Sequence, residues 1–196
     1  GYEFTYHRSD MNPDFNHRCV IYPRAGGKLL RRIDPDSDTD AKMIALLKNT
    51  NGMAYPHHCS YKLVDNDVER NIEACSSWRI CLEESNFTIE LLKQGYKVGF
   101  LGSSDTHRMI PGLAGARTCL YAEELTPESL FEAYRSRRCA ATQGFNIFID
   151  FRIDNAFIGE SITVKQPPII KAQIKAFDPI DYIEIIRDGK PIQWYN

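Results

Sequence analysis

The sequence has 196 residues, of which 43% are hydrophobic and 26% charged, and its formal net charge is −2 at pH 7. This composition is typical of a globular protein, and the length suffices for one domain plus part of a second. Because the net charge is near zero, we predict no nucleic-acid partner. No apolar run reaches the roughly 18 residues of a membrane span. The six cysteines include no Cys-x-x-Cys pair, which argues against a zinc ribbon.

Short apolar runs alternate with amphipathic segments over the first two thirds of the sequence. This alternation is typical of α/β folds. Thr126 is expected to cap a helix whose first turn contains Pro127. Strands are predicted at 1–5, 18–22, 52–56, 71–75, 97–101 and 116–121. Helices are predicted at 39–49, 84–94 and 126–137.

The pattern changes after Thr142, where no further helix is indicated. Residues 171–177 alternate polar and apolar side chains, as a half-exposed strand does. Asp188-Gly189 is a hairpin turn signal. The sequence therefore predicts a β-rich C-terminal segment. Its strands are expected at 147–153, 162–164, 169–177 and 182–187.

The strongest signal for chemistry is Gly102-Ser103-Ser104-Asp105-Thr106-His107, which follows an apolar strand. In an extended backbone, residues i and i+2 point to the same side, so Asp105 and His107 can converge on one ion. Carboxylate oxygen and imidazole nitrogen suit zinc, manganese or iron. The alternative is a turn in which Asp105 caps the backbone and His107 is an ordinary surface residue.

Other acidic and histidine residues stand in or beside predicted strands. His57 and His58 end one strand, and only one of these adjacent side chains is expected to face a shared site. The other would point outward or hydrogen-bond to a ligand. His17 precedes a strand, while Glu3 and Glu73 lie inside strands. Each is unremarkable alone, but buried charged groups at strand ends are costly unless they are paired or bind a metal.

Taken in order, these motifs resemble the second half of the PHP (polymerase and histidinol phosphatase) superfamily of metal-dependent hydrolases, and more closely its uncharacterised DUF3604 branch. The Gly-Ser-x-Asp-x-His element is the most specific of them. The motifs that carry the resemblance are Gly1-Tyr2-Glu3, His17, Pro56-His57, Ile72 to Ser76, Gly102 to His107 and Arg137 to Gly144.

The resemblance implies a set of metal ligands and their supporting residues. Asp105 and His107 would also be catalytic. Arg108 directly follows the motif, and its guanidinium matches the geometry of a substrate phosphate, so it either binds that phosphate or is an ordinary solvated loop arginine. His58 is the fallback ligand if the register differs by one, and Glu73 would support a ligand. The ligands would hold divalent zinc, manganese or iron, and they are Glu3, His17, His57, Asp105 and His107.

The fold class expected from the sequence is α/β. Residues 1–143 would form an incomplete, distorted β/α barrel (TIM-like, as in PHP proteins). Residues 144–196 would form a β-rich, sandwich-like segment, the start of an immunoglobulin-like β-sandwich. The opening His-x-His of the family lies before Gly-x-Glu and is absent here. We therefore expect this chain to hold only part of the site, and a missing N-terminal half of the barrel to complete it. A truncated chain and an inactive family member would both lack the N-terminal ligands, so the sequence does not distinguish them.

The expected function is that of a divalent-metal-dependent hydrolase, a phosphoesterase in which a metal-activated water is the nucleophile. Its partner would be a small-molecule phosphoester, although an amide or ester substrate stays open. Two alternatives remain. The chain is either a non-catalytic binding module that uses the β-rich segment for recognition, or an inactive member of the family.

Overall fold

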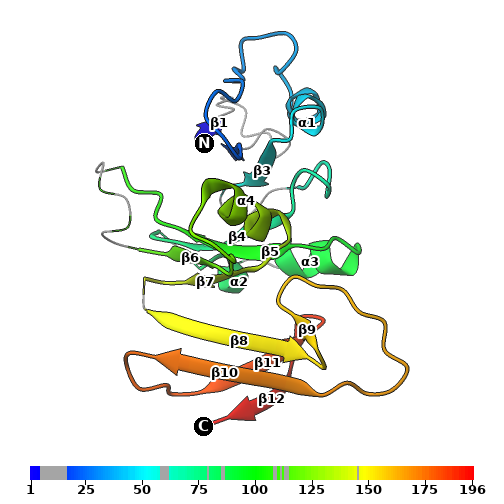
Figure 1. Cartoon of the computed structure of the whole chain (residues 1–196), viewed down its shortest axis with the longest axis vertical. Coiled ribbons are helices and arrows are strands. Elements are labelled where there is room, and N and C mark those ends of the chain that lie inside the picture. The colour runs from blue at the N-terminus through cyan, green and yellow to red at the C-terminus, as the bar shows by residue number, and fades with distance from the viewer. Residues whose placement is uncertain are drawn as a thin grey trace.

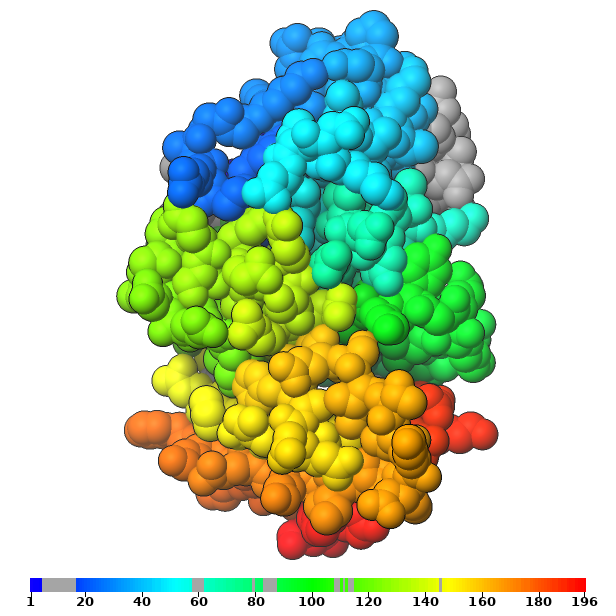
Figure 2. Space-filling view, turned by 45° about the vertical axis from the view of Figure 1, so that its right-hand side comes forward, coloured from blue at the N-terminus to red at the C-terminus, as the bar shows by residue number. Residues whose placement is uncertain are grey.

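The computed structural model describes residues 1–4, 17–57, 62–78, 80–84, 87–107, 110, 112, 115–144 and 146–196 of the chain. An N-terminal sheet, a central group of strands and a C-terminal group of strands follow one another along the long axis (Figure 1). Figure 2 shows the same order from another side, with blue, green and orange parts in succession. The order of the parts in space therefore follows their order in the sequence.

The N-terminal sheet is an antiparallel arrangement of three short strands in the order β1-β2-β3. Cys19 in the middle strand pairs with Glu3 on one side and with Tyr55 on the other. Helix α1 covers this sheet, and its apolar residues Met43 and Leu47 are fully buried in the core beneath it. The elements are β1 (Tyr2–Phe4), β2 (Arg18–Ile21), α1 (Asp40–Lys48) and β3 (Met53–Pro56).

The central strands form one parallel pair, β4 with β5, and one antiparallel pair, β6 with β7. β5 lies beside β6. The Thr118 hydroxyl accepts a hydrogen bond from Gly102 N at 3.1 Å and donates one to Gly102 O at 2.7 Å. A Cβ on Gly102 would lie 2.4 Å from the carbonyl oxygen of Arg117, so this close approach requires glycine. The strands are β4 (Asn71–Ser76), β5 (Gly99–Ser103), β6 (Arg117–Leu120) and β7 (Cys139–Thr142).

The central helices are short. The side chain of Thr126 accepts a hydrogen bond from Ser129 N at 3.3 Å and Pro127 opens the helix, which confirms the predicted cap. No helix in the described part of the chain is long and apolar enough to cross a membrane. These helices are α2 (Cys81–Glu84), α3 (Phe87–Lys93) and α4 (Pro127–Arg135).

The C-terminal segment contains a three-stranded antiparallel sheet, in the order β10-β8-β9, and a separate hairpin of β11 and β12. Asp188 and Gly189 join the hairpin with φ values of 52° and 73°, which confirms the predicted turn. The strands are β8 (Ile147–Ile153), β9 (Ala156–Phe157), β10 (Ile170–Ala176), β11 (Ile183–Arg187) and β12 (Lys190–Tyr195). The domain boundary at residue 143 stays a prediction.

The predicted α/β fold class, an incomplete TIM-like β/α barrel, is wrong. The structure consists mostly of strands in small sheets, is 15% helical, and closes no barrel within the described residues. A β/α barrel needs parallel strands joined by crossover helices. Here α1 does separate β2 from β3, yet these two strands pair antiparallel. Of the described strand pairs, only β4 and β5 are parallel.

Some individual elements also differ from prediction. Within the helix expected at 84–94, the structure describes α3 from Phe87 to Lys93, and residue 84 ends α2; residues 85 and 86 lie outside the described residues. Residues 162–164 form no strand and pair with none of the described strands; Ile162 and Val164 are 46% and 45% exposed. Strand β7 was not expected, since Cys139-Ala140-Ala141-Thr142 has neither clear alternation nor bulky β-branched residues.

A buried arginine ties β2 to the elements around it. The Arg18 side chain is 1% exposed, and its Nε lies 2.6 Å from Glu69 Oε1. Its Nη2 lies 3.1 Å from Asp40 Oδ2 at the start of α1 and donates to Lys62 O at 2.9 Å. Glu69 in turn accepts from the backbone N–H of Val64 at 2.5 Å. One guanidinium therefore connects β2, α1 and the segment before β4.

We predict that Arg18→Met destabilises the protein strongly. The change leaves two buried carboxylates without their cation, which costs about 3–5 kcal/mol in comparable buried pairs. Urea unfolding followed by circular dichroism measures the loss. Arg24→Met is the matched control, because Arg24 is 79% exposed in its pair with Glu128 and its removal should leave the unfolding midpoint unchanged. Equal midpoints for both variants would contradict the role given to Arg18.

Candidate metal centre

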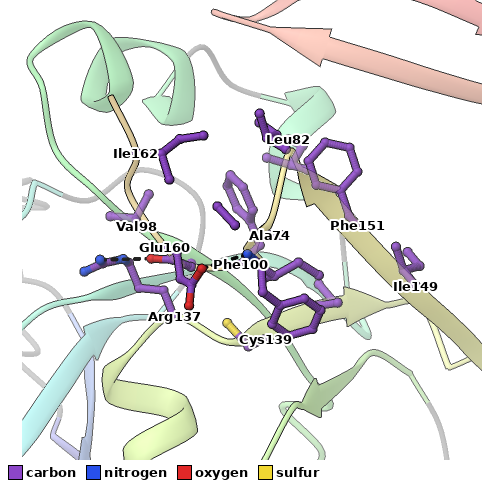
Figure 3. Close-up of a pocket in the computed structure, with 18 residues that line it drawn as sticks. Ala74, Leu82, Val98, Phe100, Arg137, Cys139, Ile149, Phe151, Glu160 and Ile162 are labelled. Carbon is purple, nitrogen blue, oxygen red and sulfur yellow. Dashed lines mark hydrogen bonds between the residues drawn. The ribbon is translucent and has the colours of Figure 1, made fainter. Parts of the chain in front are cut away.

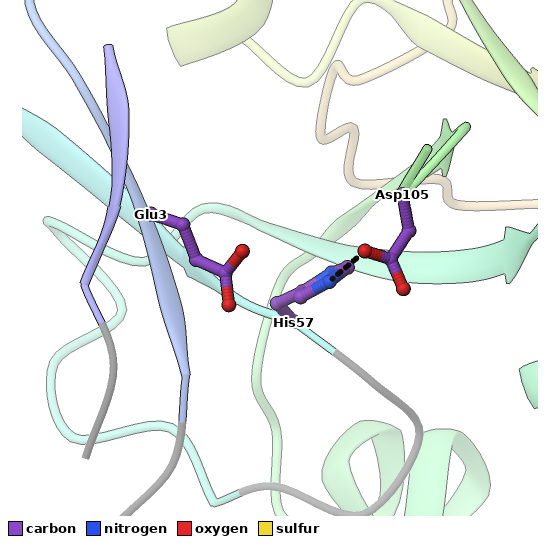
Figure 4. A group of neighbouring side chains, drawn as sticks. All are labelled: Glu3, His57 and Asp105. Atoms are coloured by element: carbon purple, nitrogen blue, oxygen red, sulfur yellow. Dashed lines mark ion pairs between the residues drawn. The ribbon is translucent and has the colours of Figure 1, made fainter. Parts of the chain in front are cut away.

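Glu3, His57 and Asp105 converge although they are far apart in the sequence (Figure 4). Glu3 comes from β1, His57 follows the end of β3, and Asp105 follows the end of β5. One ligand atom from each lies within 4.8 Å of the others. The group joins two carboxylates and an imidazole, which is a suitable donor set for a divalent transition metal.

The register of the first sheet places His17 beside His57. His57 N–H donates to the carbonyl oxygen of His17 at 3.0 Å, which extends the pairing of β2 with β3 by one step. The centroids of the His17 and His57 rings lie 6.4 Å apart. His17 Nδ1 lies 2.5 Å from Glu3 Oε1. His17 therefore contacts one of the candidate ligands directly and lies beside a second.

A buried carboxylate orients His57. Its Nδ1 lies 2.6 Å from Glu73 Oε2, and the Glu73 side chain has no exposed surface. The Ser103 hydroxyl donates to the same oxygen. This arrangement directs Nε2 of His57 toward Asp105 Oδ1, 3.5 Å away. A carboxylate behind a histidine in this way fixes the ring and its tautomer at many metal sites.

The surroundings of His57 also shift its pKa. Burial alone lowers the pKa, but the hydrogen bond and charge of Glu73 oppose it, and the charges of Asp105 and Glu3 add to that effect. The net result is a pKa above the ordinary value of histidine. His57 therefore holds a proton more tightly than a free imidazole, and a metal ion must displace that proton.

Asp105 has an unusual backbone conformation. Its φ is 43°, in the left-handed region, which Asp and Asn adopt more readily than most residues. The indole N–H of Trp78 donates to Asp105 O at 3.0 Å. The carboxylate is 11% exposed and points toward His57 (Figure 4). The turn after β5 therefore directs this side chain inward.

His107 is not among the three residues of this group, and its role as a ligand stays a prediction. The expectation that Asp105 and His107 converge assumed an extended backbone, and the positive φ of Asp105 makes that assumption wrong. The His107 side chain is 76% exposed, and its Nδ1 is 3.9 Å from Asp105 Oδ1 and 3.1 Å from Asp105 O. Its ring packs edge-on against Trp78, with centroids 5.8 Å apart. His107 lies at the edge of the site.

The charge balance of the site favours a cation. Glu3, Glu73 and Asp105 supply three carboxylates, and no described Lys or Arg pairs with Glu73 or Asp105. Glu73 Oε1 is buried and has no hydrogen-bond partner among the described residues. Cys19 lies nearby, but burial and then these carboxylates raise its pKa to about 12, which keeps it a neutral thiol. Carboxylates and imidazole are thus the available donors.

The distances can be compared with those of a bound ion. Ligand atoms about 2.0–2.2 Å from a tetrahedral zinc ion are roughly 3.3–3.6 Å apart. His57 Nε2 and Asp105 Oδ1 are 3.5 Å apart, which fits two ligands of one ion. Glu3 is within 4.8 Å of both and is 40% exposed, so its side chain has room to adjust. The residues present fit a divalent ion.

The remaining predicted site residues divide into those the structure places and those it does not. Glu73 contacts His57, in agreement with a supporting role. His58 and Arg108 lie outside the described residues. Sequence reasoning missed Ser103 and Trp78. Ser103 carried a signal, since it lies in the Gly-Ser-Ser-Asp segment, whereas nothing in the sequence pointed to Trp78.

Comparison with known proteins adds little on function. No family model and no solved structure matches the chain. An uncharacterized protein of Chlamydia muridarum (strain MoPn / Nigg) is 23% identical over 225 residues, an alignment that covers 96% of this chain and 34% of that protein. The chain thus spans about a third of the length of the curated relative that it matches. The resemblance to PHP proteins stays a prediction, and the geometry of the site is the remaining guide to function.

We predict that metal affinity falls as the pH falls, starting above the ordinary titration range of histidine. A ligand imidazole must be neutral, and the raised pKa of His57 means that protons compete at higher pH than usual. Isothermal titration calorimetry with Mn²⁺ from about pH 8 to about pH 5 measures the change. Circular dichroism at each pH serves as the control for folding. A constant affinity across this interval would contradict the role of His57.

Proposed function

We propose that this chain supplies part of the divalent-metal site of a metal-dependent hydrolase that acts on a phosphoester. The observation that carries the proposal is the convergence of Glu3, His57 and Asp105, with His57 held by the buried Glu73. Four residues from four separate segments contribute to this group. A turn that merely satisfies its own backbone would not need side chains from so many elements.

Each residue has a distinct role in the proposed site. His57 donates Nε2, and Glu73 holds the ring by accepting from Nδ1. Asp105 and Glu3 contribute carboxylate oxygens that balance the charge of a cation. Asp105, the less exposed of the two, also accepts a proton from the attacking water or orients that water. A divalent ion would supply acidification of this water and neutralisation of charge on the phosphoryl oxygens.

The choice of a phosphoester rests on charge and on the sequence resemblance. A site with three carboxylates repels an anionic substrate unless a cation lies between them, and divalent ions serve this purpose in phosphoryl chemistry. The Gly-Ser-Ser-Asp-Thr-His segment supports the same class through its similarity to PHP proteins. The phosphate-binding role of Arg108 stays a prediction.

A binding function is the second candidate, and exposed aromatic residues on the C-terminal hairpin favour it. Tyr182 and Trp194 are 57% and 55% exposed, and their rings lie 5.5 Å apart. Tyr195, the next residue of β12, is 53% exposed on the opposite face of the hairpin. Such a surface is suited to stacking against a carbohydrate or peptide. Recognition there would not require the residues of the metal centre.

We predict that Asp105→Asn weakens metal binding by roughly tenfold or more, because it removes a charged ligand. Asparagine tolerates the left-handed backbone at this position, so the substitution tests the carboxylate rather than the turn. Affinity for Mn²⁺ and Zn²⁺ is measured by calorimetry, and bound metal by mass spectrometry after purification without chelators.

Asp178→Asn is the matched control for this experiment. It makes the same chemical change at an exposed loop position outside the candidate metal group. We expect its metal affinity to equal that of the unchanged protein. If Asp105→Asn and Asp178→Asn bind Mn²⁺ equally well, Asp105 is not a ligand and the proposed site is wrong.

We further predict hydrolysis of p-nitrophenyl phosphate or bis(p-nitrophenyl) phosphate that depends on added Mn²⁺. A chelator and Asp105→Asn should each abolish the release of p-nitrophenol, whereas Asp178→Asn should retain it. Comparison with p-nitrophenyl acetate tests the substrate class. Metal-dependent cleavage of the acetate alone would leave the metal site standing but refute the phosphoester assignment.

A further inference from the structure

A cavity lies between the central strands and the C-terminal sheet, with a volume of about 470 Å³ (Figure 3). β4, β5 and β7 contribute one wall, and β8 with β9 contributes the other. Most of its lining is apolar, with large contributions from Phe100, Phe151 and Phe157. This size and lining are typical of small-molecule sites.

The cavity is separate from the candidate metal centre. Successive side chains of a strand point to opposite faces of a sheet. In β5, Phe100 lines the cavity, whereas Ser103, three residues further on, donates a hydrogen bond to Glu73 beside His57. The two sites therefore lie on opposite faces of the same strand.

Arg137 brings a positive charge to this apolar space. It lines the cavity at the end of α4 and has a φ of 59°, uncommon for a residue other than glycine. Its Nη2 donates to Gly159 O at 3.1 Å, and it forms no ion pair with any described residue. Burial, and then the neighbouring charge of Arg70, lowers the pKa of Arg137. A half-buried guanidinium with only a neutral partner is suited to binding an anion.

Glu160 also lines the cavity and brings a negative charge that opposes the effect of Arg137 on an anionic ligand. Its Oε2 accepts from the backbone N–H of Phe157 at 2.8 Å, so one oxygen already has a donor. Glu160 is exposed to solvent, whereas Arg137 is half-buried. Water screens the exposed carboxylate, so the guanidinium has the stronger effect on a ligand inside.

We propose that this cavity binds an amphiphile whose apolar chain packs against Phe100 and Phe151 and whose carboxylate pairs with Arg137. The apolar lining supplies the affinity because binding removes the apolar surface of the chain from water. The guanidinium supplies the preference for an anionic head group, because it forms two parallel hydrogen bonds with a carboxylate. The site goes beyond the hydrolase function and does not depend on it.

The test compares three ligands that share a ten-carbon chain and differ in head group: decanoate, 1-decanol and decyltrimethylammonium. Each is titrated into the ¹⁵N-labelled full chain below its solubility limit, and amide shifts report affinity and location. We expect decanoate to bind roughly tenfold or more tightly than decanol, the gain of one charge-assisted contact, and the cation to bind most weakly. The largest shifts are expected at residues 98–100 and 149–157.

Arg137→Met tests the head-group contact, with Arg24→Met as a control for loss of one positive charge elsewhere. We expect the Arg137 variant to bind decanoate and decanol equally, and the Arg24 variant to keep the preference. Retained decanol binding shows that the cavity is still formed. Should Arg137→Met fail to fold, the head-group series on the unchanged protein decides by itself.

Three outcomes would overturn the proposal. They are absence of binding by decanoate, equal affinity for decanoate and decanol in the unchanged protein, and a decanoate preference that survives in folded Arg137→Met. Ala156→Leu provides an independent check, because it places extra volume in the cavity from β9. We expect it to reduce binding of both decanoate and decanol, and unaltered binding would place the ligand elsewhere.

Discussion

The buried guanidinium of Arg18 is the constraint on which the candidate site depends. It lies between Glu69 and Asp40 and also bonds to the backbone of Lys62. A charge of this kind is stable in the interior only with its partners in place, so it determines where β2 lies relative to α1 and the segment before β4. His17 is the residue directly before Arg18. The position of the first histidine therefore follows from an ion network that takes no part in the proposed chemistry.

The same dependence extends through the sheet to the metal group. Antiparallel pairing places Glu3 and Tyr55 on either side of Cys19, and His57 continues β3 with its N–H bonded to His17 O. On the other side of the group, Glu73 in β4 and Asp105 in the turn after β5 both contact His57. Two rigid pieces of sheet thus meet at His57. Their contact explains why a buried imidazole and a buried carboxylate are tolerated: each supplies the hydrogen bond that the other needs.

Much of the local structure could be predicted from sequence, and the sheet arrangement could not. Apolar runs at β2, β3 and β8, the Thr126 cap and the Asp188-Gly189 turn carry their signals within a few residues. The antiparallel pairing of β2 with β3 leaves no such signal in the sequence. A helix between two strands is compatible with an antiparallel pair as well as with a parallel crossover. His57 was expected at the site because it ends a strand. The extended backbone assumed at Asp105 was wrong, because its φ is 43° and the residue spacing carries no signal for that conformation. The role of His107 as a metal ligand stays a prediction.

Strands β4 and β5 serve two proposed sites with opposite faces, and this geometry limits how the sites can influence each other. Glu73 and Ala74 are adjacent, yet one belongs to the metal group and the other to the apolar cavity. The glycines of β5 pack closely against their neighbours: a Cβ on Gly99 would lie 2.3 Å from Asn71 Oδ1, and a Cβ on Gly102 would lie 2.4 Å from Arg117 O. Coupling between two sites requires an element with two alternative arrangements. The closely packed β4 and β5 are not such an element in the described structure, so we expect occupancy of the cavity and of the metal centre to be independent.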